Sequence, residues 1–409
     1  MDNLHTKNNI FGDKKVLNAI YIGTLCSVAY LAVYFARNIL GTVTPKMIEG
    51  GYKEEYIGKV SSVYFIFYAV GQLINGATGD KIKARNMIAI GLFMAGVTNI
   101  LFPRIADISQ NAAIFVYGFT GFFLSMIYGP MTKVVAENTE PVYATRCSLG
   151  YTIASFLGSP LAGAVSVVFT WQSVFGLSSV ALVMMAVISF CFFIAFEKKG
   201  IVQYNRYSGK KKESGNIKVL IEHGIIKFTL ISIVTGIIRT TVVFWMPTYI
   251  SQYLGFTAEK AGMIFTVATF VICFTAFIVI FIYERLNRNM NLTILIMFSL
   301  ASVFFALVYF IKIPLLNIIL LVLAIMSSNG AACMLWSRYC PSLRDTGMVS
   351  TATGFLDFVS YMSAAASSTL FADAVSDIGW GNLILVWLSL MIAGVVIALP
   401  YDKILNKNR

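Results

Sequence analysis

Charge and histidine are scarce in this chain, and their scarcity excludes most classes of soluble protein. Only 12% of the 409 residues are charged, 58% are hydrophobic, and the mean hydropathy is +0.77. A soluble domain carries about twice as much charge. The two histidines, His5 and His223, lie in polar segments, and the sequence shows no nucleophile–base pair, metal-ligand cluster or nucleotide-binding loop. The sequence therefore indicates a membrane protein that is not an enzyme and uses no cofactor.

The six cysteines show no spacing typical of a metal site. They lie in or beside apolar stretches, where cysteine behaves as a small hydrophobic residue. We therefore expect neither disulfides nor metal ligands among Cys26, Cys147, Cys191, Cys273, Cys333 and Cys340.

Apolar stretches long enough to cross a bilayer core of about 30 Å recur along the whole chain. In lipid every backbone amide must be hydrogen-bonded internally, so each stretch is predicted to be a helix. The twelve predicted spans are 17–45, 57–79, 86–104, 111–135, 146–168, 171–196, 225–249, 260–283, 291–311, 314–337, 347–370 and 381–401.

Lysine and arginine outnumber acidic residues by 31 to 19, which gives a net charge of +12. These basic residues gather in alternate loops and do not form one basic surface. Loops rich in lysine and arginine remain on the cytoplasmic side of a membrane. The pattern argues against nucleic acid as a partner and predicts a multi-pass protein of the cytoplasmic membrane, with both termini in the cytoplasm.

One hydrophilic segment interrupts the apolar pattern near the middle of the chain. It runs from Glu197 to about Glu222 and includes Lys210, Lys211 and Lys212. A solvated linker held near anionic lipid headgroups explains it better than a binding motif does. We expect an N-terminal half of six spans at 1–196, a basic cytoplasmic linker at 197–224 and a second half at 225–409.

Arg37 and Arg239 stand inside hydrophobic stretches, where a charge is costly. A charged side chain at the bilayer centre costs roughly 2.5–3.5 kcal/mol even on a lenient insertion scale. Each arginine lies in the first span of its half, at matching depth. This pairing suggests an anion site between two pseudo-symmetric halves. The structural alternative is an arginine held by Asp357 or by backbone carbonyls.

Helical spacing places tyrosines beside Arg37. Tyr30, Tyr34 and Arg37 stand at i, i+4 and i+7, so they share one face of the first span. Tyr68 lies on a tyrosine-bearing face of the second span. Tyrosine hydroxyls beside guanidinium groups suit a multiply charged oxyanion, because the planar fork of arginine binds phosphate in a bidentate manner. A lone membrane tyrosine, by contrast, is usually a packing residue.

Two further charged residues, Lys133 and Asp357, each have two possible roles. Lys133 lies near the end of its span, where it either contacts substrate or extends to the membrane surface. Asp357 stands four residues before Tyr361 and either neutralises an arginine or contacts substrate. A buried carboxylate without any partner would be unfavourable.

A short motif follows the second span and contains Gly76, Asp80, Lys81 and Arg85. The glycines allow helices to approach closely, and the acid can pair with a helix terminus or an arginine across a gate. The motif resembles the loop signature of the major facilitator superfamily. With twelve spans and a central linker, this resemblance implies an all-α membrane protein of the major facilitator fold, with two pseudo-symmetric six-helix halves.

Within that superfamily the chain resembles the organophosphate:phosphate antiporter family over essentially its whole length. The best-matched stretches are 30–37, 68–85, 239–249 and 350–380. In that family an arginine of the first helix and one of the seventh clamp the phosphoryl group, which implies this role for Arg37 and Arg239. The expected substrate-binding set also includes Tyr30, Tyr34, Tyr68, Lys133, Trp245, Asp357 and Tyr361.

The chain also departs from glycerol-phosphate and hexose-phosphate members at positions around the clamp. Asn38, Gln72, Ser155 and Phe244 stand where those members tend to have lysine, lysine, histidine and an acidic residue, and Asp357 replaces a small residue. The loss of basic partners and the gain of Asp357 lower the positive charge of the site. We hypothesise a less anionic or zwitterionic phosphorylated substrate, such as an aminoalkyl phosphonate or an amino-sugar phosphate.

These features together predict a monomeric transporter that exchanges a small phosphorylated organic anion for inorganic phosphate by alternating access. Two other functions fit the same residues. One is a proton- or sodium-coupled symporter of an organic carboxylate or sugar acid, with Asp357 as a proton carrier. The other is a transporter-like sensor that binds a sugar phosphate and signals to a membrane kinase.

Overall fold

The computed structural model describes residues 14–78, 82–204, 217–343 and 349–399, and its described residues with regular structure are all helical. The N-terminal half contains six long helices. They are α1 (Lys14–Glu49), α2 (Glu54–Thr78), α3 (Ala84–Ala106), α4 (Gln110–Asn138), α5 (Pro141–Val168) and α6 (Trp171–Lys198). A short helix, α7 (Ile217–Glu222), precedes the C-terminal half.

The helices of the C-terminal half are more often interrupted. Its first crossing consists of α8 (Ile225–Ile237), the π-helical turn η1 (Ile238–Val242) and α9 (Val243–Gln252). The remaining elements are α10 (Ala258–Ile272), α11 (Thr275–Arg285), α12 (Met290–Phe310), α13 (Pro314–Met334), the π-helical turn η2 (Leu335–Tyr339), α14 (Cys340–Ser342) and α15 (Val349–Ala398).

Polar side chains mark where several of these helices begin. The hydroxyl or amide oxygens of Ser109, Thr170, Thr257 and Asn289 accept backbone N–H groups in the first turns of α4, α6, α10 and α12. Such caps satisfy amides that the helix itself leaves unpaired. The short loops therefore end at sequence-encoded positions, each close to a predicted span boundary.

Gly379 divides the last helix into two crossings. Among the described residues, eleven helices are long and apolar enough to span a membrane, and the last of them covers 47 residues, Ala352–Ala398. A straight helix of the 50 residues in α15 would be about 75 Å long, more than twice a bilayer core. Within α15 the backbone leaves the helical region at Gly379, where φ is 74° and ψ is 168°. The chain thus crosses twelve times, which confirms the predicted fold, although residues 371–378 continue a helix where we had expected a loop.

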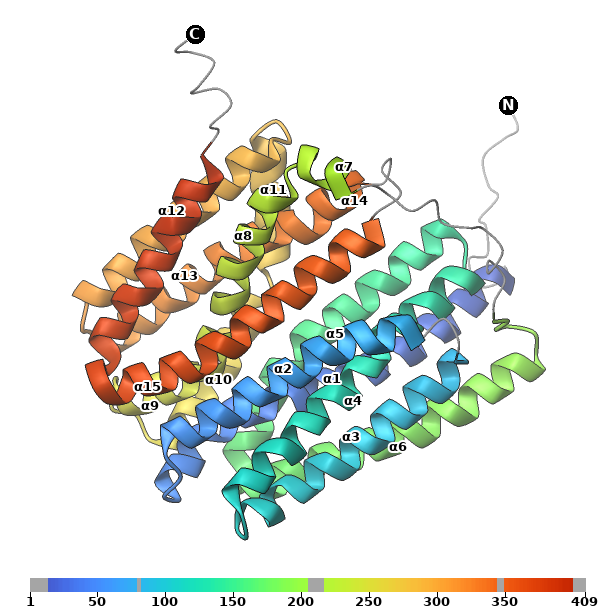
Figure 1. The fold of residues 1–409 in the computed structure, drawn as a ribbon, viewed down its shortest axis with the longest axis horizontal. Coiled ribbons are helices and arrows are strands. Elements are labelled where there is room, and N and C mark those ends of the chain that lie inside the picture. The colour runs from blue at the N-terminus through green and yellow to red at the C-terminus, as the bar shows by residue number, and fades with distance from the viewer. Residues whose placement is uncertain (1–13, 79–81, 205–216, 344–348, 400–409) are drawn as a thin grey trace, which may run out of the picture.

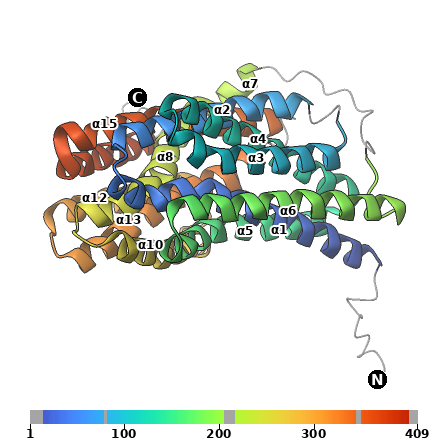
Figure 2. The same ribbon diagram turned by 90° about the horizontal axis from the view of Figure 1, so that it is seen from below.

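The two halves converge at one end and diverge toward the other (Figure 1). Figure 2 shows the same helices side-on, with the N-terminal half on the right and the C-terminal half on the left. Contacts between the halves join α2 to α15, α5 to α10 and α1 to α9. The divergent end carries the start of α1 and the end of α15.

Hydrogen bonds close the convergent end. The Gln252 amide donates to the Glu54 carboxylate at 2.6 Å and accepts the indole N–H of Trp380 at 3.0 Å. The Ser376 hydroxyl donates to Glu55 at 2.7 Å. These contacts tie the loop ends of α2, α9 and α15 together, so this end of the interface is shut in this conformation.

Glycine permits the close approach of helices on which the site depends. A Cβ on Gly158 of α5 would lie 2.4 Å from the Cβ of Tyr34, and one on Gly58 of α2 would lie 2.4 Å from the Cβ of Ala372 in α15. Small residues give membrane helices this tight packing. Tyr34 is thereby pressed against α5, and α2 is seated on the helix that carries Asp357 and Tyr361.

Candidate functional site

Arg37 lies inside a cage of aromatic rings. Its guanidinium carbon is 4.7 Å from the ring centroid of Tyr361, 5.1 Å from those of Tyr34 and Tyr68, and 5.9 Å from that of Phe65. Rings at these distances attract a cation through their quadrupoles, and more strongly where water is excluded. The cage combines side chains from α1, α2 and α15, so both halves of the protein contribute to it.

One hydrogen bond fixes the orientation of the Arg37 guanidinium. Its Nη1 donates to the Tyr361 hydroxyl at 2.8 Å. Tyr361 is itself buried and packs edge-on against Tyr68, with ring centroids 4.8 Å apart. The half-buried arginine therefore has its charge partly compensated and its geometry set before any ligand arrives, although no carboxylate of the described residues is paired with it.

A second aromatic cluster lies one turn of α1 away from the cage. Tyr30 contacts Tyr34 edge-on at 4.9 Å, and its ring centroid is 5.5 Å from Tyr128 of α4 and 6.1 Å from Tyr151 of α5. Tyr128 and Tyr151 also meet, at 6.1 Å. Tyr30, Tyr128 and Tyr151 are called the tyrosine trio below. The N-terminal half thus presents a nearly continuous tyrosine surface.

Arg239 has very different surroundings. It lies in η1, where the first crossing of the second half changes from α-helix to π-helix. Arg239 makes no hydrogen bond, ion pair or cation–π contact with any described residue, in contrast to the hydrogen bond and ring contacts of Arg37. Single π-turns within α-helices are frequent at functional sites. The turn brings a half-buried arginine into the site with its donors still available.

The charges of both arginines act on the Asp357 carboxylate. It interacts with Arg239 and, more weakly, with Arg37, and it stands one turn from Tyr361 on α15. No ion pair within 4.0 Å joins it to either arginine, and no described residue donates a hydrogen bond to it. The structural alternative of a tight Arg–Asp pair is therefore not what this conformation shows. The formal charges of the two guanidinium groups and the one carboxylate sum to one positive unit.

The remaining predicted binding residues are placed less centrally. Lys133 is half-buried on α4, more than one turn beyond Tyr128. Trp245 is fully buried, packs edge-on against Phe244 at 5.3 Å, and has an indole N–H without a partner among the described residues. Neither residue belongs to the cage around Arg37.

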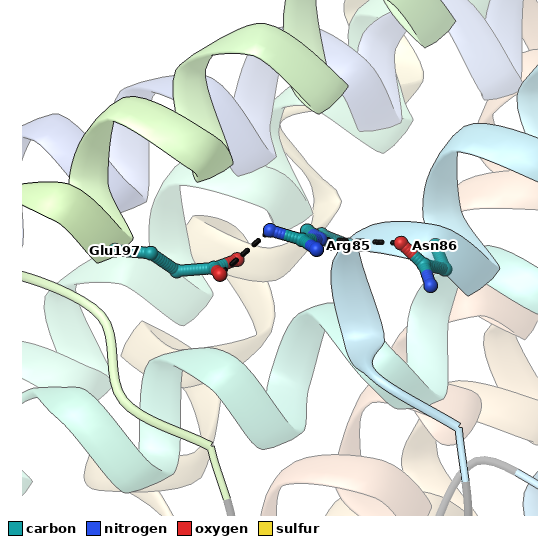
Figure 3. Close-up of polar contacts among 3 residues, drawn as sticks. All are labelled: Arg85, Asn86 and Glu197. Atoms are coloured by element: carbon teal, nitrogen blue, oxygen red, sulfur yellow. Dashed lines mark hydrogen bonds and ion pairs between the residues drawn. The ribbon is translucent and has the colours of Figure 1, made fainter.

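Arg85 is the one member of the predicted loop motif whose side-chain contacts are described. Its Nη1 pairs with Glu197 at the end of α6 at 2.6 Å, and its Nε donates to Asn86 at 3.2 Å (Figure 3). Both carboxylate and guanidinium belong to the N-terminal half, so this pair joins α3 to α6 and does not bridge the halves. Asp80 and Lys81 lie outside the described residues, as does the environment of Gly76.

Sequence reasoning missed three ring contributors: Phe65, Tyr128 and Tyr151. Phe65 follows Tyr64 on a helix rich in aromatic residues, and nothing in its spacing separates it from a packing residue. Tyr128 and Tyr151 have no second tyrosine three, four or seven residues away in their helices, so helical spacing does not mark them as part of a tyrosine-bearing face. Their only signal is a hydroxyl in an apolar run, which is too common in membrane proteins to single them out.

Comparison with known proteins agrees with this architecture. The family model described as "Major Facilitator Superfamily" matches residues 26–369. The glycerol-3-phosphate transporter of Bacillus subtilis (strain 168) is 22% identical over 420 residues, which cover 95% of this chain and 93% of the relative. The glucose-6-phosphate exchanger SLC37A2 of Bos taurus is 21% identical over 258 residues, which cover 51% of each protein.

Solved structures support the fold independently of sequence. The crystal structure of the nucleoside transporter NupG superposes with a TM-score of 0.73 at 12% identity, covering 93% of this chain and 98% of that one. At this identity the likeness concerns the fold alone. The predicted resemblance to the organophosphate:phosphate antiporters is confirmed by the relatives, and the fold is one of transporters and not of enzymes. This chain is a multi-pass membrane transporter that belongs to the Major Facilitator Superfamily.

Proposed function

We propose that the protein is a secondary transporter that exchanges a small phosphorylated organic anion for inorganic phosphate. Arg37 and Arg239 bind the phosphoryl group, one from each half of the molecule. The observation that supports the proposal is that Arg37 and Arg239, one from each half, both act electrostatically on Asp357 and form no ion pair with a described carboxylate. The relatives named as a glycerol-3-phosphate transporter and a glucose-6-phosphate exchanger support a phosphorylated substrate.

The charge of the empty site favours exchange over one-way transport. Alternating access requires the site to close before it opens on the other side. Closing it without ligand would bury a net positive charge away from water, which is strongly unfavourable. The negative charge of a bound phosphoryl group offsets that positive charge. The protein therefore returns empty only slowly, and an outgoing phosphate allows it to cycle.

The structure corresponds to one end point of this cycle. The convergent end is held shut by Gln252, Glu54 and Trp380, while the halves diverge at the end that carries the start of α1 and the end of α15. We assign the divergent end to the cytoplasm, following the positive-inside pattern of the sequence. In this assignment the site faces inward and receives cytoplasmic phosphate.

Asp357 supports one competing function. A membrane-embedded carboxylate without an ion pair is typical of a proton carrier, so proton-coupled symport of an organic anion is the second candidate. A symporter would depend on the proton gradient and would not need phosphate on the opposite side. Exchange would need phosphate on both sides and proceed without a gradient.

The test is phosphate self-exchange in proteoliposomes, with unlabelled phosphate inside and labelled phosphate outside. Arg37→Lys and Arg239→Lys keep the charge but lose the planar fork, and each is expected to slow exchange about 10- to 100-fold, the loss of one charge-assisted hydrogen bond. Arg104→Lys, at an exposed arginine at the end of α3, is the control. Absence of exchange by folded wild-type protein would contradict the proposal.

A further inference from the structure

The Asp357 carboxylate has no close partner among the residues that the structure describes. It is half-buried, no described residue donates a hydrogen bond to it, and neither arginine approaches within 4.0 Å. A carboxylate withdrawn from water is unfavourable unless a charge or a hydrogen bond compensates it. The missing group is a cation or a donor that the ligand can bring.

Charge balance indicates which kind of ligand fits. The empty site has two guanidinium groups and one carboxylate, a net charge of one positive unit. A phosphate monoester carries about −1.5 to −2 at neutral pH, which would leave the filled site negative. An ammonium group on the same ligand brings the sum close to zero. A site that must close away from water is best filled by the ligand that neutralises it.

The tyrosine trio supplies the second component of a cation subsite. The Tyr30 ring lies 4.9 Å from the Tyr34 ring of the Arg37 cage, and the Tyr128 ring lies 5.5 Å from that of Tyr30 and 6.1 Å from that of Tyr151. Ring faces and edges of this kind recognise alkylammonium groups, particularly where water is excluded. The trio of the N-terminal half therefore adjoins the Arg37 cage, and Asp357 of the C-terminal half stands one turn from Tyr361 of the same cage.

We propose that the substrate is a zwitterionic phosphorylated amine, with its phosphoryl group on Arg37 and Arg239 and its ammonium group between Asp357 and the tyrosine trio. This inference rests on the proposed function, because it places the amine relative to the phosphoryl site. The alternative is that Asp357 only reduces the positive electrostatic potential around Arg239. In that case an amine on the ligand does not increase its affinity.

The test compares two ligands that differ only in the amine. Phosphoethanolamine and 2-hydroxyethyl phosphate have the same length and the same phosphoryl group. Their affinities for the purified wild-type protein, measured by calorimetry, are expected to differ at least about tenfold in favour of the amine, as for a close charge pair. In Asp357→Asn the ratio of the two affinities is expected to fall to near one. Asp377→Asn, on the same helix but exposed, should keep the wild-type ratio.

Three results would contradict the inference. Equal affinities in the wild type, failure of both ligands to bind, or a ratio that survives in Asp357→Asn would contradict it. If Asp357→Asn does not fold, Tyr128→Leu serves instead, and the ratio should also fall there. Phosphate exchange that persists without any amine preference overturns this inference alone, whereas absence of phosphate exchange overturns the proposed function.

Discussion

Arg37 and Arg239 occupy corresponding positions in the two halves, yet the protein surrounds them differently. Arg37 has a hydrogen bond to Tyr361 and four aromatic rings within 5.9 Å. Arg239 stands on a π-turn with none of these contacts among the described residues. The pseudo-symmetry of the sequence therefore extends to the charges but not to their environments. One arginine is organised in advance by protein, and the other is left for the ligand to neutralise.

This difference suggests a division of labour within the clamp. A group already held in its binding geometry loses little entropy when the ligand arrives, so under the proposed function we expect Arg37 to set the position of the phosphoryl group. A group without described partners gains most from the ligand, so we expect Arg239 to supply the change in charge that permits closure. Four predictions separate these roles.

Removing either charge should slow transport, but the two variants should differ in stability. Arg37→Met and Arg239→Met are each expected to reduce phosphate exchange at least about 10-fold, since a close charge pair is worth about 1.5–7 kcal/mol. Arg37→Met also loses the Tyr361 hydrogen bond and the ring contacts, about 1–3 kcal/mol of stability. Arg239→Met removes an unpartnered charge and should unfold near the wild-type temperature. Exchange assays measure the loss of transport, and thermal unfolding in detergent measures the loss of stability, with Arg104→Met as the control for each. Equal destabilisation by Arg37→Met and Arg239→Met would contradict the proposed difference between the two arginines.

Arg85 provides a third, purely structural arginine for this comparison. It is paired with Glu197 at 2.6 Å, and the two side chains are only 21% and 22% exposed. Arg85→Met leaves that carboxylate unpaired and should lower the free energy of unfolding by about 1–3 kcal/mol. Because the pair lies within one half, the concentration of phosphate that half-saturates exchange should remain unchanged. A large change in that concentration would place Arg85 in substrate recognition instead.

The Tyr361 hydroxyl tests how far the position of Arg37 is fixed in advance. Tyr361→Phe keeps the ring but removes the hydrogen bond at 2.8 Å, so phosphate affinity should weaken about 2- to 10-fold, the range for one hydrogen bond. Tyr68→Phe removes a hydroxyl from a ring that also faces Arg37 without a hydrogen bond to it, and serves as the matched control. The same loss in both variants would show that the Tyr361 bond is not what orients the guanidinium.

The smallest effect is expected at the closed end of the interface. Gln252→Ala removes the bonds to Glu54 and Trp380, which lie partly in solvent and together contribute about 1 kcal/mol or less. The variant should shift the protein toward the outward-open state, seen as a longer distance between spin labels on α2 and α9. Asn382→Ala, whose amide bonds only within α15, should not change the distance. A distance unchanged in Gln252→Ala would show that packing alone closes this end.

Helix number and the central charges could be predicted from the sequence because both follow from local rules. Spans follow from apolar length, and Tyr30, Tyr34 and Arg37 share a face because of helical periodicity alone. The resemblance to a known family then indicated which arginines pair across the halves. The structure places Tyr30, Tyr34 and Arg37 in a row of contacts along α1, and the joint role of the two arginines stays a prediction.

The other features depend on contacts between distant segments. The cage needs Tyr361, which lies 324 residues from Arg37 in the sequence. The tyrosine trio is assembled from three helices, and each member carries only a weak signal in its own span. The π-turn at Arg239 leaves no mark in composition, and the break in α15 is set by a single glycine conformation. Tertiary packing decides such features, and one sequence does not encode them locally.

The most direct test of the two-arginine clamp is a double-mutant cycle for phosphate binding. Calorimetry would give the affinity of inorganic phosphate for the wild type, Arg37→Lys, Arg239→Lys and the double variant. If both arginines hold one phosphoryl group, each single change weakens binding, and the double change weakens it by less than the sum, with a coupling of at least about 1 kcal/mol. Strictly additive losses, or full affinity in either single variant, would contradict the account.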